Sequence, residues 1–452
     1  MDIIVVGDGK VGLAITAQLS REGHNLTVID SNPNVLESSV EQYDVMALRG
    51  NGASLPVLRE AGAETADLLI AATSTDEVNM LTCILARRLG TRHTIARVRN
   101  PEYAEQLHFL REELGLSMTV NPELAAATEA YHILQFPTFL HREAFAKGRV
   151  EIVELRIGSD SRLKDIPLSR MQQAVSVKTL VCAVERQGKV FIPGGDFILR
   201  EGDKIHVTAA SGDLVRLVSR LGLVNHKIHS CMIIGGSRIA YYLASLLLKS
   251  HISVKIIELN KTRCEELSDL LPKAVIIHGD GNRQRLLLEE GLRETDALVT
   301  LTGMDEQNIF LSLYGSHEGV GKVITKISQT EYYHVIQEMG IESVISPKVL
   351  SATQVVRYVR AMANATGGSV ITMTELADGR VEALEFLATP NTLHLSTSFA
   401  ETPIRRNILI ACIIRKGKTF IPQGSDCLRE GDGVIVVASS ELAITNLNDI
   451  FE

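Results

Sequence analysis

The sequence predicts an α/β protein made of two tandem Rossmann-like, doubly wound parallel sheets, each followed by a small α+β subdomain. Three observations predict this class. The chain repeats itself, short apolar runs alternate with helical patterns early in each repeat, and turn-rich alternating strands follow later in each repeat. We therefore expect four domains, at residues 1–145, 146–225, 229–365 and 366–452.

The internal repeat sets this domain count. Gly50-Asn51-Gly52 returns as Gly279-Asp280-Gly281, which gives a shift of 279 − 50 = 229 residues. With the same shift, Leu199-Arg200-Glu201-Gly202-Asp203 returns as Leu428-Arg429-Glu430-Gly431-Asp432. Because one shift holds from the turn at Gly50 to the REGD turn, the chain is two copies of one long unit.

The first part of the first copy alternates between strands and helices. It begins with an apolar strand at 3–6, a glycine-rich turn and a helix that extends to Leu19. Further strands are expected at 26–30, 44–48, 66–72, 94–98 and 117–120, and helices at 33–43, 56–61 and 76–90. This order is typical of a parallel sheet covered on both faces. Asn121-Pro122 then predicts a helix start, and Pro137 is expected to break or kink that helix.

After Gly148 the pattern changes to that of a small α+β domain. Short alternating strands are expected at 150–157, 179–186, 190–192 and 204–209, with a closing helix at 213–221. A linker at 222–229 leads to the second copy. There, strands are expected at 231–234 and 254–258, Ser346-Pro347 replaces Asn121-Pro122, and the small domain begins near Ser369.

Composition excludes several classes of function. A net charge of −8, 4% aromatic residues and no tryptophan argue against nucleic-acid binding. The six cysteines form no CxxC pair, which favours a reduced, cytosolic chain. Met1-Asp2 leads directly into a strand without a basic signal region, and the longest apolar stretch, Ile239–Leu248, is too short to span a bilayer. His226 and His229 lack a nearby third ligand, so no metal site is expected.

Between the first strand and the first helix lies a GxGxxG motif, Gly7-Asp8-Gly9-Lys10-Val11-Gly12. Gly7 would permit the tight turn, Gly9 the approach of a pyrophosphate, and Gly12 close packing of helix on strand. Asp30 ends the second strand and would bind a ribose diol while repelling a 2′-phosphate, which favours NAD over NADP. The alternative is a Rossmann shape that has lost its ligand.

The second copy departs from this motif. Gly235 is kept, but Ser237 replaces the second glycine and Ala240 replaces the third. Ser237 places a side chain where a pyrophosphate would approach, whereas Glu258 keeps the acidic residue. We expect this loop to bind a nucleotide weakly, to bind a different nucleotide, or to be structural.

Further candidates follow the later strands. Gly50-Asn51-Gly52 could wrap an adenosine edge or be a bare turn. Thr73 and Asp76 follow the fourth strand, where ligands of open parallel sheets bind, although Thr73 or Ser74 could equally cap the next helix.

Two arginines, Arg97 and Arg99, end the fifth strand, and alternation places both on one face. A guanidinium there could hold a phosphate. The second copy has Lys326 and Ser328 instead, which is a weaker basic pair. The candidate cofactor-binding residues are Gly7, Asp8, Gly9, Lys10, Val11, Gly12, Asp30, Gly50, Asn51, Thr73, Asp76, Arg97, Gly235 and Glu258. We expect no catalytic residue.

Together these segments resemble the RCK (regulator of potassium conductance) family, and more narrowly the tandem regulatory subunits of Trk-type potassium uptake systems. The resemblance covers essentially the whole chain. It rests on GDGKVG followed by Asp30, on RGNGAS, ATSTDEVNM and ARVRNPEY, and on the turn at 193–196 before REGD. In that family's terms, the Rossmann-like domains are RCK_N domains and the small domains are RCK_C domains.

The resemblance implies a cytosolic regulatory subunit that lies on the inner face of the cell membrane through a protein partner. That partner would be a membrane-embedded potassium channel or transporter subunit of Trk type. Four chains would form a homotetramer with eight RCK units in a gating ring. The family binds NAD(H), or ATP and ADP, in the GxGxxG crevice, which implicates Gly7, Gly9, Gly12, Asp30, Asp76 and Arg97. The helices from Glu123 and Lys348 match the family's crossover and dimerisation helices.

Three other functions are compatible with a Rossmann core. The chain could regulate a different RCK-gated cation channel or transporter. An NAD-dependent oxidoreductase would need an acid–base residue beside the nicotinamide, and the small domains offer no such constellation. A ligand-binding transcription factor would need a helix-turn-helix and a basic face, which the sequence lacks.

Overall fold

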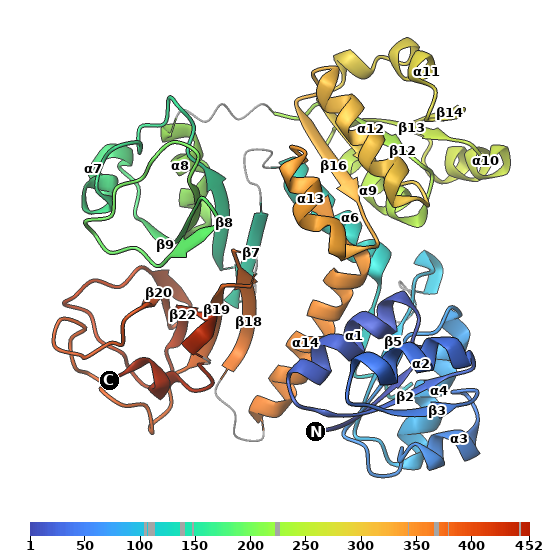
Figure 1. Ribbon diagram of the computed structural model, residues 1–452, viewed down its shortest axis with the longest axis horizontal. Coiled ribbons are helices and arrows are strands. Elements are labelled where there is room, and N and C mark those ends of the chain that lie inside the picture. Colours follow the sequence, from blue (N-terminus) through green and yellow to red (C-terminus); the bar gives the residue numbers. More distant parts are fainter. Residues whose placement is uncertain are drawn as a thin grey trace. The chain divides into compact units, whose positions relative to one another are not determined.

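The structure is a computed structural model (Figure 1). It describes residues 1–103, 106, 114–135, 141–146, 149–221, 227–341, 343–365, 370–377, 379–442 and 444–452. The chain divides into two compact units, Met1–Leu134 with Ile228–Tyr358 and Gln135–Lys227 with Val359–Glu452. The first unit holds both parallel sheets, and the second unit holds both antiparallel sheets. The predicted fold class is confirmed.

The first Rossmann domain is a six-stranded parallel sheet in the order β3-β2-β1-β4-β5-β6. Its strands are β1 (Asp2–Val6), β2 (Asn25–Asp30), β3 (Met46–Arg49), β4 (Leu68–Ala71), β5 (His93–Arg97) and β6 (Met118–Val120). Its helices are α1 (Lys10–Arg21), α2 (Pro33–Gln42), α3 (Leu55–Glu60) and α4 (Asp76–Leu89). The chain runs outward from β1 to β3 and then returns to β4, so the strand order reverses between β1 and β4. Ligands of such sheets bind at this switch point, outside the carboxyl ends of the strands.

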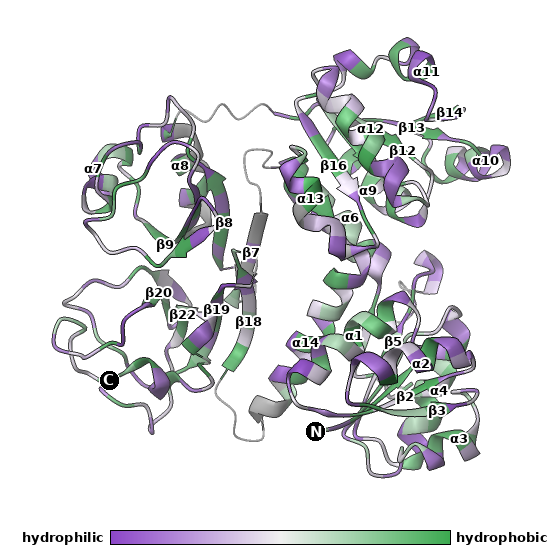
Figure 2. Cartoon of the chain, viewed as in Figure 1, coloured by the Kyte–Doolittle hydropathy of each residue, from purple (hydrophilic) through white to green (hydrophobic). Residues whose placement is uncertain are grey.

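The second Rossmann domain has the same topology, in the order β14-β13-β12-β15-β16-β17. Its strands are β12 (Ser230–Ile234), β13 (Ser253–Glu258), β14 (Val275–His278), β15 (Ala297–Thr300), β16 (Lys322–Lys326) and β17 (Val344–Ile345). Its helices are α9 (Arg238–Lys249), α10 (Lys261–Leu270), α11 (Gln284–Glu289), α12 (Asp305–His317) and α13 (Tyr333–Glu338). Hydrophobic residues gather along α9 (Figure 2), because this helix is covered on more than one side.

Two long helices, α6 (Pro122–Gln135) and α14 (Pro347–Ala365), join the two Rossmann domains. As predicted, α6 starts at Asn121-Pro122, and the Asn121 side chain accepts a hydrogen bond from the Leu124 amide (2.9 Å). The small residues of α6, such as Ala126 and Ala130, then pack in the core of the second copy. Pro137, the expected kink, lies outside the described residues.

The helix α14 makes the reciprocal contact with the first copy. The Tyr358 hydroxyl lies 3.2 Å from Nδ1 of His93 in β5, and the two rings meet edge to face. Each Rossmann domain is therefore contacted by the last helix of the other, which fits the crossover role implied by the resemblance.

Each small domain is a five-stranded antiparallel sheet. The first contains β7 (His141–Phe145), β8 (Val150–Arg156), β9 (Thr179–Arg186), β10 (Lys189–Phe191) and β11 (Lys204–Ala210), with helices α7 (Met171–Val175) and α8 (Ser211–Arg220). The second contains β18 (Val370–Leu376), β19 (Val381–Leu387), β20 (Ile408–Arg415), β21 (Lys418–Phe420) and β22 (Gly433–Ser439). The two share one apolar core, in which Phe145 and Cys182 pack with Leu376, Val381 and Cys412.

The REGD turn has a structural role in both small domains. Asp203 is 1% exposed, and its two carboxylate oxygens accept hydrogen bonds from Nε and Nη2 of Arg186, both at 2.7 Å. Asp432 and Arg415 repeat this pair in the second copy. A buried carboxylate must be paired, which explains why the aspartate recurs.

Two features differ from expectation. The strand β7 was not predicted, because its sequence HREAF has no alternating apolar run. The closing helix of the first copy, α8, has no α-helical counterpart among the described residues of the second. There, short 3₁₀ helices at Ser440–Leu442 and Leu447–Ile450 close the domain, and the Asn446 side chain caps the second of them.

Candidate functional site

The glycine loop of the first copy crosses the switch point between β1 and β4. Gly7 follows β1 with φ +88°, and its amide donates to the carbonyl of Ile29 (2.8 Å). A Cβ on Gly7 would lie 2.7 Å from the backbone of Thr73 in the loop after β4. Only glycine satisfies both the left-handed φ and this close approach, so Gly7 brings the two loops of the crevice into contact.

Gly9 leaves space at the start of helix α1. It is exposed, it is the N-cap of α1, and a Cβ built there meets no atom within 4 Å. No side chain caps α1. The first amides of a helix lack intrahelical partners and carry the positive end of the helix dipole. The loop therefore presents free N–H donors toward open space, as an anion site requires.

Lys10, at the first position of α1, adds to this positive field. Its side chain is exposed, and no acidic residue lies in the first turn of the helix. The helix dipole disfavours a cation at this end unless an anion binds there. The next residue of the motif, Val11, is buried and anchors the helix in the sheet core. Gly12 is also required, because a Cβ on it would lie 1.9 Å from the carbonyl oxygen of Gly7.

Asp30, the predicted ribose ligand, holds the glycine loop. Its Oδ2 accepts from the amide of Asp8 (2.8 Å), and its Oδ1 accepts from the amide of Asn32 (2.8 Å). It is half-buried at the end of β2, beside the loop. A carboxylate has about four lone-pair sites, so these two bonds leave acceptor capacity for ribose hydroxyls.

Asp8 is buried in the loop, with 1% of its surface exposed. Its carboxylate accepts hydrogen bonds from the hydroxyls of Ser39 in α2 and, at 3.5 Å, Thr16 in α1. Burial raises the pKa of Asp8 to about 6; the Ser39 bond opposes the shift, the charge of Asp30 adds to it, and the Thr16 bond opposes it. This carboxyl therefore titrates near neutral pH.

The turn at Gly50-Asn51-Gly52 lies next to Asp30. The Gly50 amide donates to the carbonyl of Asp30 (2.9 Å), and the Asn51 side chain accepts from the amide of Ala53 (3.0 Å). A Cβ on Gly52 would lie 2.0 Å from a methyl of Val6, so this glycine is required by packing. The turn therefore borders the crevice at the ribose end of the predicted site.

The loop after β4 is tied to β5 by a buried amide. The Asn79 side chain accepts from the Thr73 amide (2.8 Å) and hydroxyl (2.6 Å), and it donates to the Arg97 carbonyl (2.9 Å). The N-cap of α4 is Thr75, and no side chain caps the helix, so Thr73 and Ser74 are not capping residues. Thr73 instead lies at the switch point, with its hydroxyl engaged by Asn79.

Asp76 holds the turn that follows β5. Its Oδ2 accepts from the amides of Arg99 and Asn100, both at 2.8 Å, and its Oδ1 lies 3.3 Å from Nε of Arg99. Asp305 repeats the two amide bonds in the second copy. This structural role accounts for the recurrence of the aspartate, and it directs the Arg99 guanidinium to the carbonyl of Ser74.

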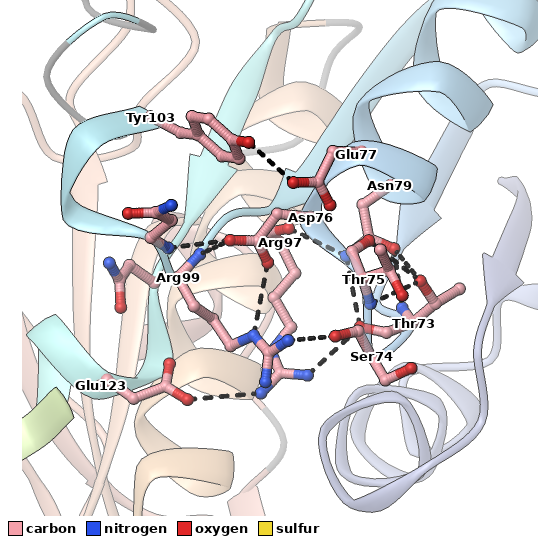
Figure 3. Close-up of polar contacts among 12 residues, drawn as sticks. Thr73, Ser74, Thr75, Asp76, Glu77, Asn79, Arg97, Arg99, Tyr103 and Glu123 are labelled. Carbon is pink, nitrogen blue, oxygen red and sulfur yellow. Dashed lines mark hydrogen bonds and ion pairs between the residues drawn. The ribbon is translucent and has the colours of Figure 1, made fainter. Parts of the chain in front are cut away.

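Arg97 and Glu123 form an ion pair beside this loop, and each keeps one polar atom without a hydrogen-bond partner (Figure 3). Nη1 of Arg97 donates to the carbonyl of Thr73 (3.3 Å), and Nη2 lies 3.6 Å from Oε1 of Glu123. Among the described residues, Nε of Arg97 and Oε2 of Glu123 are buried without a hydrogen-bond partner. Buried polar atoms are normally paired, so these two have capacity for a ligand.

The second copy has a more closed loop. The Ser237 hydroxyl accepts from the amide of Ala240 (3.4 Å) and so caps α9. Glu258 accepts from the amides of Gly236 (2.5 Å) and Asn260 (2.7 Å), as Asp30 does in the first copy. Lys326, in the place of Arg97, donates to the carbonyl of Thr302 (2.7 Å). Its first glycine, Gly235, keeps a left-handed φ of +100°.

Cations of each copy approach the site of the other. Burial lowers the pKa of Arg97, Glu123 opposes this shift, and Arg238 at the start of α9 is among the smaller causes that lower it further. Burial likewise lowers the pKa of Lys326, with a smaller lowering from Lys10. The Tyr242 hydroxyl of α9 also donates to the Arg99 carbonyl (3.1 Å). Arg238 and Lys10 therefore each act on a basic residue of the other copy, while the carboxylates of Glu123 and Asp305 act in the opposite direction.

Sequence reasoning missed two residues of this site. Asn79 is not among the predicted site residues, because an amide inside a helix carries no local signal that it links two strand ends. Glu123 was read only as the start of a helix, and its contact with Arg97 depends on the crossing of the chain after β6. The recurrence of Asn79 as Asn308 was the one available hint.

Neither a metal site nor a membrane span is found in the part of the chain that the structure describes. No group of three histidine, cysteine or acidic side chains there could hold a metal ion. His226 lies outside the described residues, and the His229 amide donates to Asp296 (2.8 Å). None of the described helices has the length and apolar character needed to cross a bilayer.

Comparison with known proteins agrees with this architecture. The TrkA-N domain family matches residues 3–122 and 231–347, and the TrkA-C domain family matches residues 152–222. The Trk system potassium uptake protein TrkA of Halomonas elongata is 30% identical over 458 residues, which cover 100% of this chain and 99% of that protein.

Solved structures show the same fold. The GsuK RCK domain has a TM-score of 0.64 at 19% identity and covers 97% of this chain and 92% of that chain. The GsuK channel bound to NAD also has a TM-score of 0.64, at 20% identity, and covers 97% of this chain and 77% of that chain. The RCK resemblance of the sequence is confirmed at the level of fold. Since the TrkA-N matches alone span more than half of its residues, the chain belongs to the TrkA family of Trk system potassium uptake proteins.

Proposed function

We propose that this chain is the nucleotide-binding regulatory subunit of a Trk-type potassium uptake system. The observation that carries the proposal is the open glycine loop of the first copy, in a chain similar over its full length to a Trk system protein. Free helix N–H groups meet empty space at Gly9, and a cation lies in the first helical turn. Both features favour an anionic ligand such as a pyrophosphate.

NAD(H) is the proposed ligand of the first Rossmann domain, with ATP or ADP as alternatives. Asp30 keeps acceptor capacity for a ribose diol and would repel a 2′-phosphate. The GsuK channel, which shares the fold, has been seen with NAD. Gly7, Gly9 and Gly12 would form the phosphate cradle, and Gly50-Asn51 would border the ribose.

Arg97 and Glu123 are the proposed contacts for the part of the nucleotide that lies beyond the phosphate cradle. Their unpaired atoms, Arg97 Nε and Glu123 Oε2, offer one donor and one acceptor in a buried position. Thr73 and Asp76 would act through the loop that they hold rather than by direct contact. We propose only a weak or structural role for the second loop, because Ser237 already caps its helix.

We further propose that the chain acts by changing conformation and not by catalysis. A nucleotide that binds one of two states about a hundredfold more tightly shifts their equilibrium by about 2.7 kcal/mol per site. Several coupled sites in an assembly would therefore be enough to move a gate. We also propose that the chain consists of four domains, with boundaries near residues 145, 225 and 365.

The proposed partner is a membrane-embedded potassium channel or transporter subunit of Trk type. A homotetramer of this chain would place eight Rossmann domains in a ring on the inner face of the membrane. The pairing of homologous domains within one chain supports the ring assembly, since one compact unit contains both Rossmann domains and the other contains both small domains. Regulation of another cation channel is the remaining alternative.

The test is potassium uptake at low external potassium, in cells that lack other potassium systems. We expect deletion of the gene to reduce uptake and the wild-type gene to restore it. Gly9→Asp should not restore uptake, because a carboxylate in the space at Gly9 would repel a phosphate. Since a Cβ at Gly9 contacts nothing, this variant should keep the fold, which circular dichroism would check.

Two outcomes would contradict the proposal. Full restoration of uptake by a folded Gly9→Asp chain would exclude control by the first loop. Oxidation of NADH by the purified chain with carbonyl substrates would show an oxidoreductase instead. Ser237→Asp is the matched control and is expected to restore uptake.

A further inference from the structure

The carboxyl group of Asp8 is an unusual constituent of a phosphate-binding loop. It lies between two glycines of the GxGxxG motif, one residue from the N-cap of α1, and it is 1% exposed. A bound pyrophosphate would face the same loop from the solvent side at Gly9. An ionised Asp8 would therefore place a buried negative charge close behind the predicted position of the phosphates.

Among the residues that the structure describes, the hydrogen-bond partners of the Asp8 carboxyl are hydroxyls and none is a cation. Ser39 of α2 and Thr16 of α1 donate to its two oxygens. Asp30 at the end of β2 acts on this carboxyl with a charge of the same sign, and Lys10, the cation of the same motif, has an exposed side chain. Hydroxyls can accept as well as donate, so they also suit a protonated carboxyl. The cluster can hold Asp8 in either protonation state.

The second copy lacks this cluster entirely. Gly236 occupies the place of Asp8, Ala244 the place of Thr16, and Leu267 the place of Ser39. A Cβ on Gly236 would lie 2.7 Å from a methyl of Leu267 and 2.9 Å from Oε2 of Glu258, so these two side chains leave no room for an aspartate at this position. Because the carboxyl and both of its hydroxyl partners are absent together, the second loop is a natural control within the same chain.

A negative charge behind the loop opposes anion binding, whereas a neutral carboxyl does not. We propose that nucleotide binding by the first Rossmann domain is coupled to uptake of a proton by Asp8, so that this site binds more tightly in acid. This coupling rests on the proposed function, because it requires that the first loop binds a nucleotide. The second loop, with Gly236 in place of the carboxyl, has no such coupling.

The size of the effect follows from linkage. Two like charges separated by two residues of backbone at a partly buried site change the affinity by roughly tenfold. The pKa of Asp8 in the free chain is about 6. Since a tenfold coupling raises it by about one unit in the complex, binding near pH 6 should take up about 0.4 proton per nucleotide.

The experiment uses the purified full-length chain and NAD⁺ as the probe. The pyrophosphate of NAD⁺ keeps its charge over the range tested, whereas the terminal phosphate of ADP or ATP titrates near pH 6 and would confuse the result. Titration calorimetry at about pH 5 and about pH 8 should give a Kd that is about tenfold lower in acid for the wild type. Asp8→Asn keeps the size and the hydrogen bonds, and it should bind at both values with the acid-form affinity of the wild type.

A second measurement does not depend on a variant that folds. At about pH 6, the wild type is titrated in two buffers of different ionisation enthalpy, and the difference in heat should show the uptake of about 0.4 proton. Gly9→Asp removes the first site, so any residual binding reports the second loop and should not depend on pH.

The outcomes separate the two proposals. A wild-type affinity that is equal at both values of pH, with no proton taken up, would overturn the coupling while leaving nucleotide regulation intact. A pH dependence that persists unchanged in Asp8→Asn would assign it to another group and overturn the role of Asp8. Absence of NAD⁺ binding at every pH, in both the wild type and Asp8→Asn, would overturn the coupling together with the NAD(H) assignment.

Discussion

The two glycine loops of this chain have the same topology but different chemistry. Both follow the first strand of a doubly wound sheet, and both are held by an acidic residue, Asp30 in the first copy and Glu258 in the second. In the first copy the helix start is open at Gly9, whereas in the second the Ser237 hydroxyl caps it. In both copies an acidic residue and a first glycine hold the loop, and we propose that the second position of the motif decides whether an anion can approach.

The first prediction concerns what the two loops share. A Cβ on Gly7 would lie 2.7 Å from the Thr73 backbone, and one on Gly235 would lie 2.8 Å from the Leu301 carbonyl oxygen. Both glycines have positive φ. We expect Gly7→Ala and Gly235→Ala each to destabilise the fold by about 3–4 kcal/mol, measured by urea unfolding. Gly9→Ala is the control and should stay within about 1 kcal/mol of the wild type.

The second prediction concerns Asp8, which only the first loop contains. The native carboxyl holds its proton up to about pH 6, whereas the carboxyl of the unfolded chain loses it near the ordinary aspartate pKa of 3.8. Stability from this group is therefore present in acid and falls as the pH rises from about 4 to about 6, by about 3 kcal/mol in all. The difference in unfolding free energy between wild type and Asp8→Asn, followed against pH, should show this fall. A difference that is constant with pH would contradict the raised pKa.

The third prediction converts the first loop into the second. Gly9→Ser should weaken NAD⁺ binding by about tenfold, because the hydroxyl would cap α1 and occupy the approach to its amides, as Ser237 does in α9. Ser237→Gly in the second loop should show whether opening that loop alone creates a site. Equal affinities of wild type and Gly9→Ser in calorimetry would show that the second glycine is not the deciding difference.

The smallest effect is expected at the end of the fifth strand. Arg97→Lys copies Lys326 of the second copy and removes the unpaired Nε donor beside Glu123. We expect about fivefold weaker nucleotide binding, because a lysine has its donors on one nitrogen and cannot reproduce the spread of the guanidinium over the Thr73 carbonyl, Glu123 and a ligand. Lys326→Arg should leave the nucleotide affinity of the first site unchanged. A similar loss of affinity in Arg97→Lys and Lys326→Arg would refute a separate role for Arg97.

Much of the architecture could be predicted from sequence because it is encoded locally. The strands of the sheets are short apolar runs, and the start of α6 is marked by Asn121-Pro122. The repeat and the GxGxxG motif identified the loop that lies at the switch point. The fold class and the membership of the potassium-linked family were both predicted on this basis.

What could not be predicted depends on contacts between distant parts of the chain. The family resemblance implied a crossover helix from Glu123, but its sequence does not show which residues of the second copy α6 packs against. The contact of Glu123 with Arg97 and the approach of Arg238 follow from that crossing. The burial of Asp8 was equally invisible, because aspartate is usually exposed and its partners Ser39 and Thr16 lie on two different helices.

The most direct test of the difference between the two copies is the number of nucleotides bound per chain. NADH is titrated into the wild type, Gly9→Asp and Ser237→Asp by calorimetry, with folding checked by circular dichroism. We expect one tight site per chain, lost in Gly9→Asp and retained in Ser237→Asp. Two equal sites, or a tight site lost only in Ser237→Asp, would contradict the assignment of nucleotide binding to the first loop.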